Sequence, residues 1–194
     1  MKTIYIMLTK TESVFCYLIK RYTHEPYAHV SLLFNDDFTC GYSFSRKKVR
    51  NPFIGGFKEE DYVKWVAAFP KTECQMYELT ISDTQYTKLL DVLSPFLNEP
   101  TKYKYNILGV IGRLFHIKIE PKHSYFCSQF VSYILSKADI IHFDKKPILT
   151  TAKDFRTHSD LNLIYEGFLN ALLDDPQGLV SSYITQREEL YNVV

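Results

Sequence analysis

The spacing of apolar residues along the chain switches between a period of two, which is typical of strands, and a period near 3.6, which is typical of amphipathic helices. Alternation, or a short apolar run bounded by turn residues, predicts strands over residues 1–10, 28–34, 38–45, 74–81 and 161–166. The longer period predicts helices over residues 11–22, 82–97, 103–117, 126–135 and 152–157, and a last helix after Pro176. We therefore expect an α+β fold in which a small antiparallel sheet packs against helices.

The second and third predicted strands form a hairpin around the turn residues 35–37. The apolar row of the first of these strands consists of Ala28, Val30, Leu32 and Phe34. His29 lies on the opposite face. Both apolar rows must share one side of the hairpin, which pairs Phe34 with Phe38 and puts Ser43 directly across from His29. Two alternatives remain on the same strand if a bulge intervenes, Tyr42 and Ser45.

Two segments each allow two interpretations. The basic run 46–50 and the loop 51–57 fit a solvated edge of the sheet, or a patch for an anionic substrate beside a flexible flap. The apolar segment 103–117 contains Gly109 and Gly112, whose spacing allows close helix packing. It fits a buried helix, or a segment that lies on a membrane surface.

Length and composition limit the class of protein. The chain has 194 residues, of which 46% are hydrophobic, which is enough for one domain over residues 1–194 with a C-terminal helical extension over residues 176–194. A net charge of +1 gives no electrostatic case for nucleic acid. No run approaches the ~20 apolar residues of a membrane span, and the N-terminal run is too short for a secretion signal. We expect a cytoplasmic protein without stable membrane insertion; the oligomeric state stays open.

One cysteine lies where a thiol becomes reactive. The chain has 4 cysteines, far apart in sequence, which predicts reduced thiols rather than a disulfide framework. The apolar face of one predicted helix begins at Phe126, so Cys127 lies in its first turn. Unpaired N–H groups and the helix dipole favour the thiolate there, which is the attacking species in cysteine chemistry. The alternative for a cysteine on a helix is a small buried hydrophobe.

A catalytic thiol needs a base, and the chain has 6 histidines. His29 stands out because it lies on a predicted strand, off the apolar face and opposite a polar residue. The histidines and cysteines show no paired ligands at the short spacing of metal sites, so we expect no metal and no cofactor. Neither a P-loop nor the G-x-S-x-G context of a serine nucleophile occurs.

Three segments, in their order along the chain, carry a resemblance to a known family. They are Ala28-His29-Val30-Ser31, Tyr42-Ser43-Phe44 and Tyr125-Phe126-Cys127-Ser128-Gln129-Phe130-Val131. The combination resembles the circularly permuted papain-like cysteine hydrolases, which include bacterial YiiX-like proteins and relatives of the NlpC-type peptidases and of lecithin retinol acyltransferase. In the unpermuted enzymes the cysteine precedes the histidine. The resemblance covers most of the chain and implies a papain-like fold with the nucleophile at a helix N-terminus.

The resemblance also implies a role for each site residue. Cys127 would be the nucleophile, His29 the general base and then the general acid, and Ser43 the third polar residue. Relatives often carry His, Glu, Asn or Gln at that third position. The Cys127 backbone N–H and the Tyr125 hydroxyl would hold the oxyanion. The expected substrate site is completed by two further residues, Ser128 and Tyr42.

We therefore expect a cysteine-dependent hydrolase of amide or ester bonds, of peptidase or amidase type, acting through a thioacyl-enzyme. Its substrate would be peptide-like or an acylated small molecule. One alternative is a non-catalytic binding module on the same fold, favoured by the neutral Ser43 and by the basic, aromatic residues 46–57. The other is a lipid acyltransferase or lipase, favoured by the apolar segment 103–117.

Overall fold

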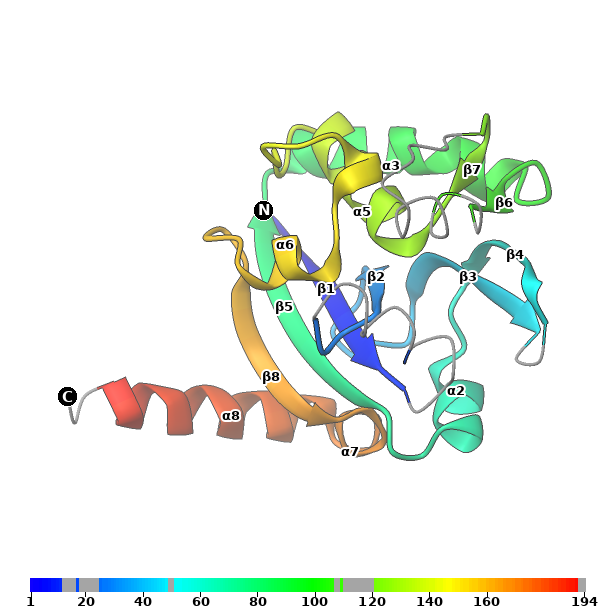
Figure 1. Ribbon diagram of the computed structural model, residues 1–194. Helices are drawn as coiled ribbons and strands as arrows, with labels where there is room; N and C mark the ends of the chain where they lie inside the picture. Colours follow the sequence, from blue (N-terminus) through cyan, green and yellow to red (C-terminus); the bar gives the residue numbers. More distant parts are fainter. Residues whose placement is uncertain (12–16, 18–24, 49–50, 107–108, 110–120, 192–194) are drawn as a thin grey trace.

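The core of the molecule is a mixed eight-stranded sheet, with strand order β7-β6-β4-β3-β2-β1-β5-β8 (Figure 1). The computed structural model describes residues 1–11, 17, 25–48, 51–106, 109 and 121–191. Neighbouring strands are antiparallel, except that β6 and β7 run parallel. The fold is thus mixed α/β, and its sheet is larger than the small antiparallel sheet predicted from the sequence.

The strands are β1 (Lys2–Lys10), β2 (His29–Leu33), β3 (Gly41–Lys48), β4 (Asn51–Glu59), β5 (Glu73–Ile81), β6 (Lys104–Tyr105), β7 (Ser124–Tyr125) and β8 (Asn162–Phe168). The helices of the described residues are α2 (Tyr62–Ala68), α3 (Asp83–Asn98), α5 (Cys127–Lys137), α6 (Ala152–Arg156), α7 (Leu169–Asp174) and α8 (Pro176–Tyr191), with a 3-10 turn η1 (Pro147–Leu149).

Both faces of the sheet are covered, as the alternation along β1 requires. Ile6 belongs to a core cluster on one face, to which α3 and α5 contribute apolar residues such as Phe96 and Phe130. Met7 belongs to a second cluster on the other face, together with Leu169 of α7 and the apolar residues of α8. Figure 1 shows α3 and α5 on one side of the sheet and α7 and α8 on the other. Strand β1 is therefore buried on both faces.

The sequence predicts the start of helix α3 correctly. Ser82 caps α3 by accepting the Gln85 N–H at 3.1 Å, while the Gln85 side chain accepts the Ser82 N–H at 3.0 Å. This is the capping box predicted by the spacing of the two residues. The predicted helix over residues 11–22 lies outside the described residues, apart from Thr11 and Tyr17. None of the described helices combines the length and hydrophobicity needed to span a bilayer.

The segment 103–117, predicted to be helical from its first residue, begins differently. Lys104 and Tyr105 form β6, which pairs with β4 and β7, so the expected helical start is wrong. Much of the remainder, residues 107–108 and 110–117, lies outside the described residues.

Strand β4 covers residues 51–59, most of which the sequence assigned to a loop. The prediction is wrong because Pro52, Gly55 and Gly56 are residue types depleted in strands. The structure explains why a glycine lies at position 55: a Cβ there would be only 2.7 Å from the Tyr105 Cβ. The backbone of β4 must approach β6 closely at this point. Because this strand was not predicted, the position of the residue that follows it, Glu60, could not be predicted either.

The predicted register of the β2–β3 hairpin is wrong by two residues. Leu32 pairs with Tyr42, not with Cys40. The side chains of Asn35 and Asp37 lengthen the turn, because they accept the backbone N–H groups of Cys40 at 2.9 Å and of Thr39 at 3.1 Å. Phe38 has a positive φ of 57° and is buried in the core of the other face, instead of pairing with Phe34.

Candidate active site

Cys127 is the first residue of α5, at the junction between β7 and the helix. Phe126, between the two elements, has an extended backbone with φ −107° and ψ 170°. The Phe126 carbonyl accepts the Phe130 N–H at 2.9 Å, while the Gln129 side chain accepts the Phe126 N–H at 3.4 Å. The sulfur of Cys127 consequently lies at the positive end of the helix dipole, and its side chain is buried.

His29 is the first residue of β2, and its backbone is fixed on β1. It pairs with Thr9, and the preceding Ala28 N–H donates to the Thr9 carbonyl at 3.1 Å. The imidazole is 14% exposed. The indole ring of Trp65, from α2, packs against it with ring centroids 5.0 Å apart. The pairing of His29 with β1 and the contact with the Trp65 ring together restrict the directions in which the imidazole can point.

The imidazole of His29 and the thiol of Cys127 lie close enough for each to shift the pKa of the other. The sulfur also lies 3.9 Å from the Ala28 carbonyl oxygen and is stabilised by the backbone N–H groups of Val30 and Ser128. Residues from the start of β2 and the start of α5 therefore surround the sulfur. The two residues singled out in the sequence are brought together.

The third polar group at the imidazole is Glu60. Its Oε1 lies 3.0 Å from Nε2 of His29. The Glu60 side chain is fully buried, and its second oxygen, Oε2, lies 3.0 Å from Nζ of Lys58. Glu60 follows β4 directly and precedes Asp61, which caps α2 by accepting the Lys64 N–H at 3.0 Å. The β4–α2 junction thus delivers both Glu60 and Trp65 to His29.

Charge decides the protonation of the buried pair. Burial works against the imidazolium, but the Cys127 thiolate and Glu60 outweigh it and raise the pKa of His29 to about 9. Burial also works against the thiolate, yet the charge and hydrogen bond of His29, helped by backbone N–H groups, lower the pKa of Cys127. The pKa of Glu60 is lowered in the same way: His29 and Lys58 outweigh its burial. The two shifts together favour a thiolate beside an imidazolium over the neutral pair.

Ser43 does not take the position predicted for it across from His29. The hairpin register moves it by two residues, and its buried hydroxyl donates to the Val30 carbonyl at 2.7 Å. On its other side Ser43 pairs with Lys58 of β4. The prediction of Ser43 as the group that orients His29 is wrong, because the longer turn shifts β3 and the carboxylate of Glu60, which follows β4, lies against the imidazole.

The three remaining residues of the predicted site have contacts of their own. The ring of Tyr125 packs in the aromatic core, with centroids 5.3 Å from Phe44 and 5.6 Å from Phe96. The Ser128 hydroxyl donates to the Thr150 carbonyl at 2.7 Å, while its N–H serves the sulfur. Tyr42 stacks on Phe57, with centroids 5.7 Å apart. These contacts hold β7, α5 and β3 in the core of the molecule.

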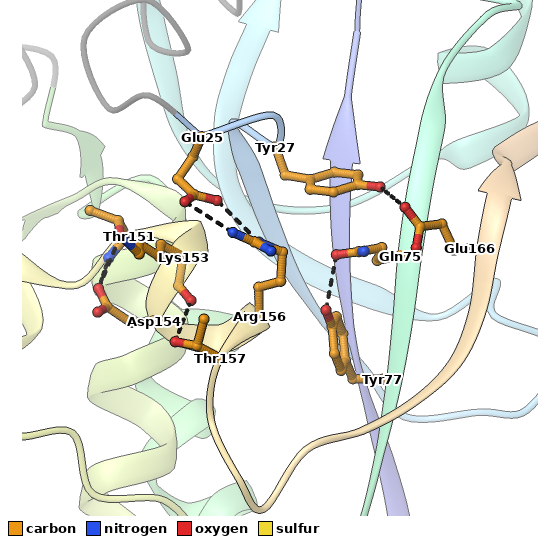
Figure 2. Close-up of polar contacts among 10 residues, drawn as sticks. All are labelled: Glu25, Tyr27, Gln75, Tyr77, Thr151, Lys153, Asp154, Arg156, Thr157 and Glu166. Carbon is orange, nitrogen blue, oxygen red and sulfur yellow. Dashed lines mark hydrogen bonds and ion pairs between the residues drawn. The ribbon is translucent and has the colours of Figure 1, made fainter. Parts of the chain in front are cut away.

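A polar network holds the segment that leads into β2 (Figure 2). The carboxylate of the buried Glu25 accepts two hydrogen bonds from Arg156 of α6, both at 3.1 Å. The Tyr27 hydroxyl donates to Glu166 of β8 at 3.1 Å. The chain just before His29 is thereby tied to α6 and β8, far from it in sequence.

Sequence reasoning missed Glu60, Lys58 and Trp65. A usable signal existed only for the start of α2, where Asp61 is a residue type preferred at helix N-termini. Lys58 and Glu60 are two apart, so an extended chain puts them on one side, but this matters only once β4 is known. Among the residues described, no group of three or more His, Cys, Asp or Glu side chains could hold a metal ion. Comparison of the chain with protein-family models and with curated proteins finds no match.

Proposed function

We propose that this chain is a cysteine-dependent hydrolase of amide or ester bonds that acts through a thioacyl-enzyme. The observation that supports the proposal is the connected series Cys127, His29 and Glu60, in which a thiol at a helix start meets an imidazole held by a buried carboxylate. Nucleophile, base and orienting group are the three parts that this chemistry requires.

In the acylation step, the Cys127 thiolate attacks the carbonyl carbon of the substrate. The carbonyl oxygen becomes an oxyanion, for which N–H groups at the start of α5, including that of Cys127, are the proposed donors. As the intermediate collapses, the imidazolium of His29 gives its proton to the leaving amine or alcohol. The products are a thioester on Cys127, a neutral His29 and the released amine or alcohol.

In the deacylation step, neutral His29 takes a proton from a water molecule that attacks the thioester carbonyl. The second oxyanion collapses, the carbon–sulfur bond breaks and the Cys127 thiolate leaves. The carboxylic acid product departs, and the thiolate and imidazolium are restored. Glu60 supports both steps, since it keeps the imidazole oriented and stabilises its charged form without itself taking the proton.

The resemblance to the permuted papain-like hydrolases supports the same assignment, with Glu60 as the third residue. A carboxylate there removes one of the two reasons for preferring a non-catalytic binding module, namely the neutral Ser43. The other reason was the basic, aromatic residues 46–57. The lipid-directed alternative depended on segment 103–117, most of which lies outside the described residues. We therefore propose peptide-like or acylated small molecules as substrates, and the reducing cytoplasm as a location compatible with the free thiols of Cys40, Cys74 and Cys127.

The proposal is tested with the full chain and a thiol-directed library of acyl probes, together with chromogenic esters and fluorogenic aminoacyl amides. The expected result is labelling of Cys127 by a subset of acyl groups and turnover of the matching ester or amide. C127S should abolish both. C40S is the control, because Cys40 is a free thiol outside the proposed site.

Fast alkylation of Cys127 by iodoacetamide is the minimal requirement, and peptide mass mapping measures it against Cys74. Burial, followed by the charges of Glu166 and Glu73, raises the pKa of Cys74 well above that of an ordinary thiol. If Cys127 reacts no faster than Cys74, or if H29A leaves its rate unchanged, the thiolate–imidazolium pair does not exist and the proposal fails.

A further inference from the structure

The buried carboxylate of Glu60 has two neighbours of the same charge sign. One oxygen faces the imidazole of His29 and the other faces the ammonium of Lys58, each at 3.0 Å. Glu60 is fully buried, whereas the Lys58 side chain is 32% exposed and reaches the carboxylate from the sheet surface. The four groups therefore form a series of alternating charge: Lys58, Glu60, His29 and Cys127.

The position of Lys58 in this series is fixed by β4. It lies on β4, where it pairs with Ser43 of β3, and it precedes Glu60 by two residues. Because alternate residues of an extended chain point to the same side, the end of β4 and the residue that follows it present the lysine and the carboxylate together. The ammonium of Lys58 then forms an ion pair with Oε2 of Glu60, the oxygen that does not contact His29.

We propose that Lys58 is a positioning residue for His29 that acts through Glu60. It fixes the carboxylate so that one oxygen alone serves the imidazole, and its positive charge limits how strongly Glu60 stabilises the imidazolium. This role rests on the proposed hydrolase function, since it concerns His29 as the general base of the deacylation step. In deacylation the imidazole must be neutral to take a proton from water, and an unopposed buried carboxylate would keep it charged.

Few charged groups among the described residues influence His29 and Glu60. The imidazole is influenced by Cys127 of α5 and by Glu60. The carboxylate is influenced in turn by His29 and Lys58, and it acts on the neighbouring phenol of Tyr62 in α2. Once Cys127 is acylated, its charge is gone. The balance between Glu60 and Lys58 then decides whether His29 is neutral.

The test is an NMR titration of the His29 ring in full-length C127S, which removes the thiolate as acylation does. Adding K58M should move the titration midpoint of His29 to higher pH by about 0.5–1 unit, since a positive charge near the imidazolium is lost. K58Q, which keeps a hydrogen-bond donor without the charge, should move it in the same direction. K58R should restore the C127S midpoint.

The matched control is K64M. Lys64 is close in sequence, highly exposed and paired with Asp61, not with Glu60. An unchanged midpoint in both K58M and K58Q, or an equal shift in K64M, overturns the role of Lys58. K58Q provides the answer if K58M does not fold.

A second readout separates this inference from the proposed function. With Cys127 present, burst kinetics should show that K58Q slows deacylation at neutral pH and moves its rising limb to higher pH, while K58R does not. If the His29 midpoint shifts as expected but no substrate is turned over, the hydrolase proposal fails and the positioning role stands. If turnover occurs and deacylation in K58Q follows the wild-type pH profile, only the role of Lys58 fails.

Discussion

The Glu60 carboxylate lies 3.0 Å from Nε2 of His29, although 31 positions separate the two residues. The contact exists because β4 returns alongside β3 and ends where the chain turns into α2. It places a fully buried negative charge against the imidazole. Both this carboxylate and the Cys127 thiolate stabilise an imidazolium there.

Replacing this carboxylate by its neutral isostere tests its contribution. E60Q should lower kcat/KM by roughly 10²-fold, because the amide no longer stabilises the imidazolium and can hold the ring in the wrong tautomer. Alkylation of Cys127 by iodoacetamide at neutral pH should slow as well. E59Q is the matched control, since Glu59 is adjacent and exposed. Equal rates for E60Q and wild type would remove Glu60 from the site.

The pH dependence of turnover follows from the two pKa shifts. The rising limb should lie below the range of an ordinary thiol, because the pKa of Cys127 is lowered. The falling limb should lie near pH 9, where the imidazolium of His29 loses the proton needed by the leaving group. A bell-shaped profile of kcat/KM between these limbs is expected.

Alkylation provides the complementary profile, because it needs the thiolate but no proton donor. The rate at Cys127 should rise at the same low pH and should not fall above pH 9, where the thiolate persists. A rising limb near the range of an ordinary thiol would show that the pair is not formed.

The parts of the fold that were predictable are those fixed by local chemistry. Ser82 and Gln85 mark the start of α3 through a capping box, and the apolar stripe from Phe126 marks α5, so Cys127 could be placed in a first helical turn. Such signals depend on a few neighbouring residues. His29 was also recognised locally, as a polar residue off the apolar face of a strand.

The parts that failed depend on contacts between distant segments. Gly55 belongs to a strand because Tyr105 packs closely against the backbone there, which composition cannot show. The hairpin register depends on how the side chains of Asn35 and Asp37 bind the turn backbone. Without β4 and the correct register, Ser43 appeared to be the partner of His29 and Glu60 had no assigned position.

The corrected role of Ser43 is structural and can be tested directly. S43A should lower the free energy of unfolding by about 1 kcal/mol, because the buried hydroxyl that donates to the Val30 carbonyl at 2.7 Å is lost. Urea denaturation measures this. Alkylation of Cys127 should stay close to the wild-type rate. A loss of reactivity as large as that in E60Q would instead return Ser43 to the catalytic group.

The ion pair between Glu25 and Arg156 should support the site from a distance. R156M leaves the buried Glu25 carboxylate without its guanidinium and should lower the free energy of unfolding by about 1–3 kcal/mol. Trp65 is the single tryptophan of the chain and packs on His29, so its fluorescence during urea denaturation reports the state of the site. The double variant E25Q/R156M should recover part of the loss, because it removes the buried negative charge together with the guanidinium that faces it. If the two single losses simply add in the double variant, the pair does not couple α6 to the segment before His29.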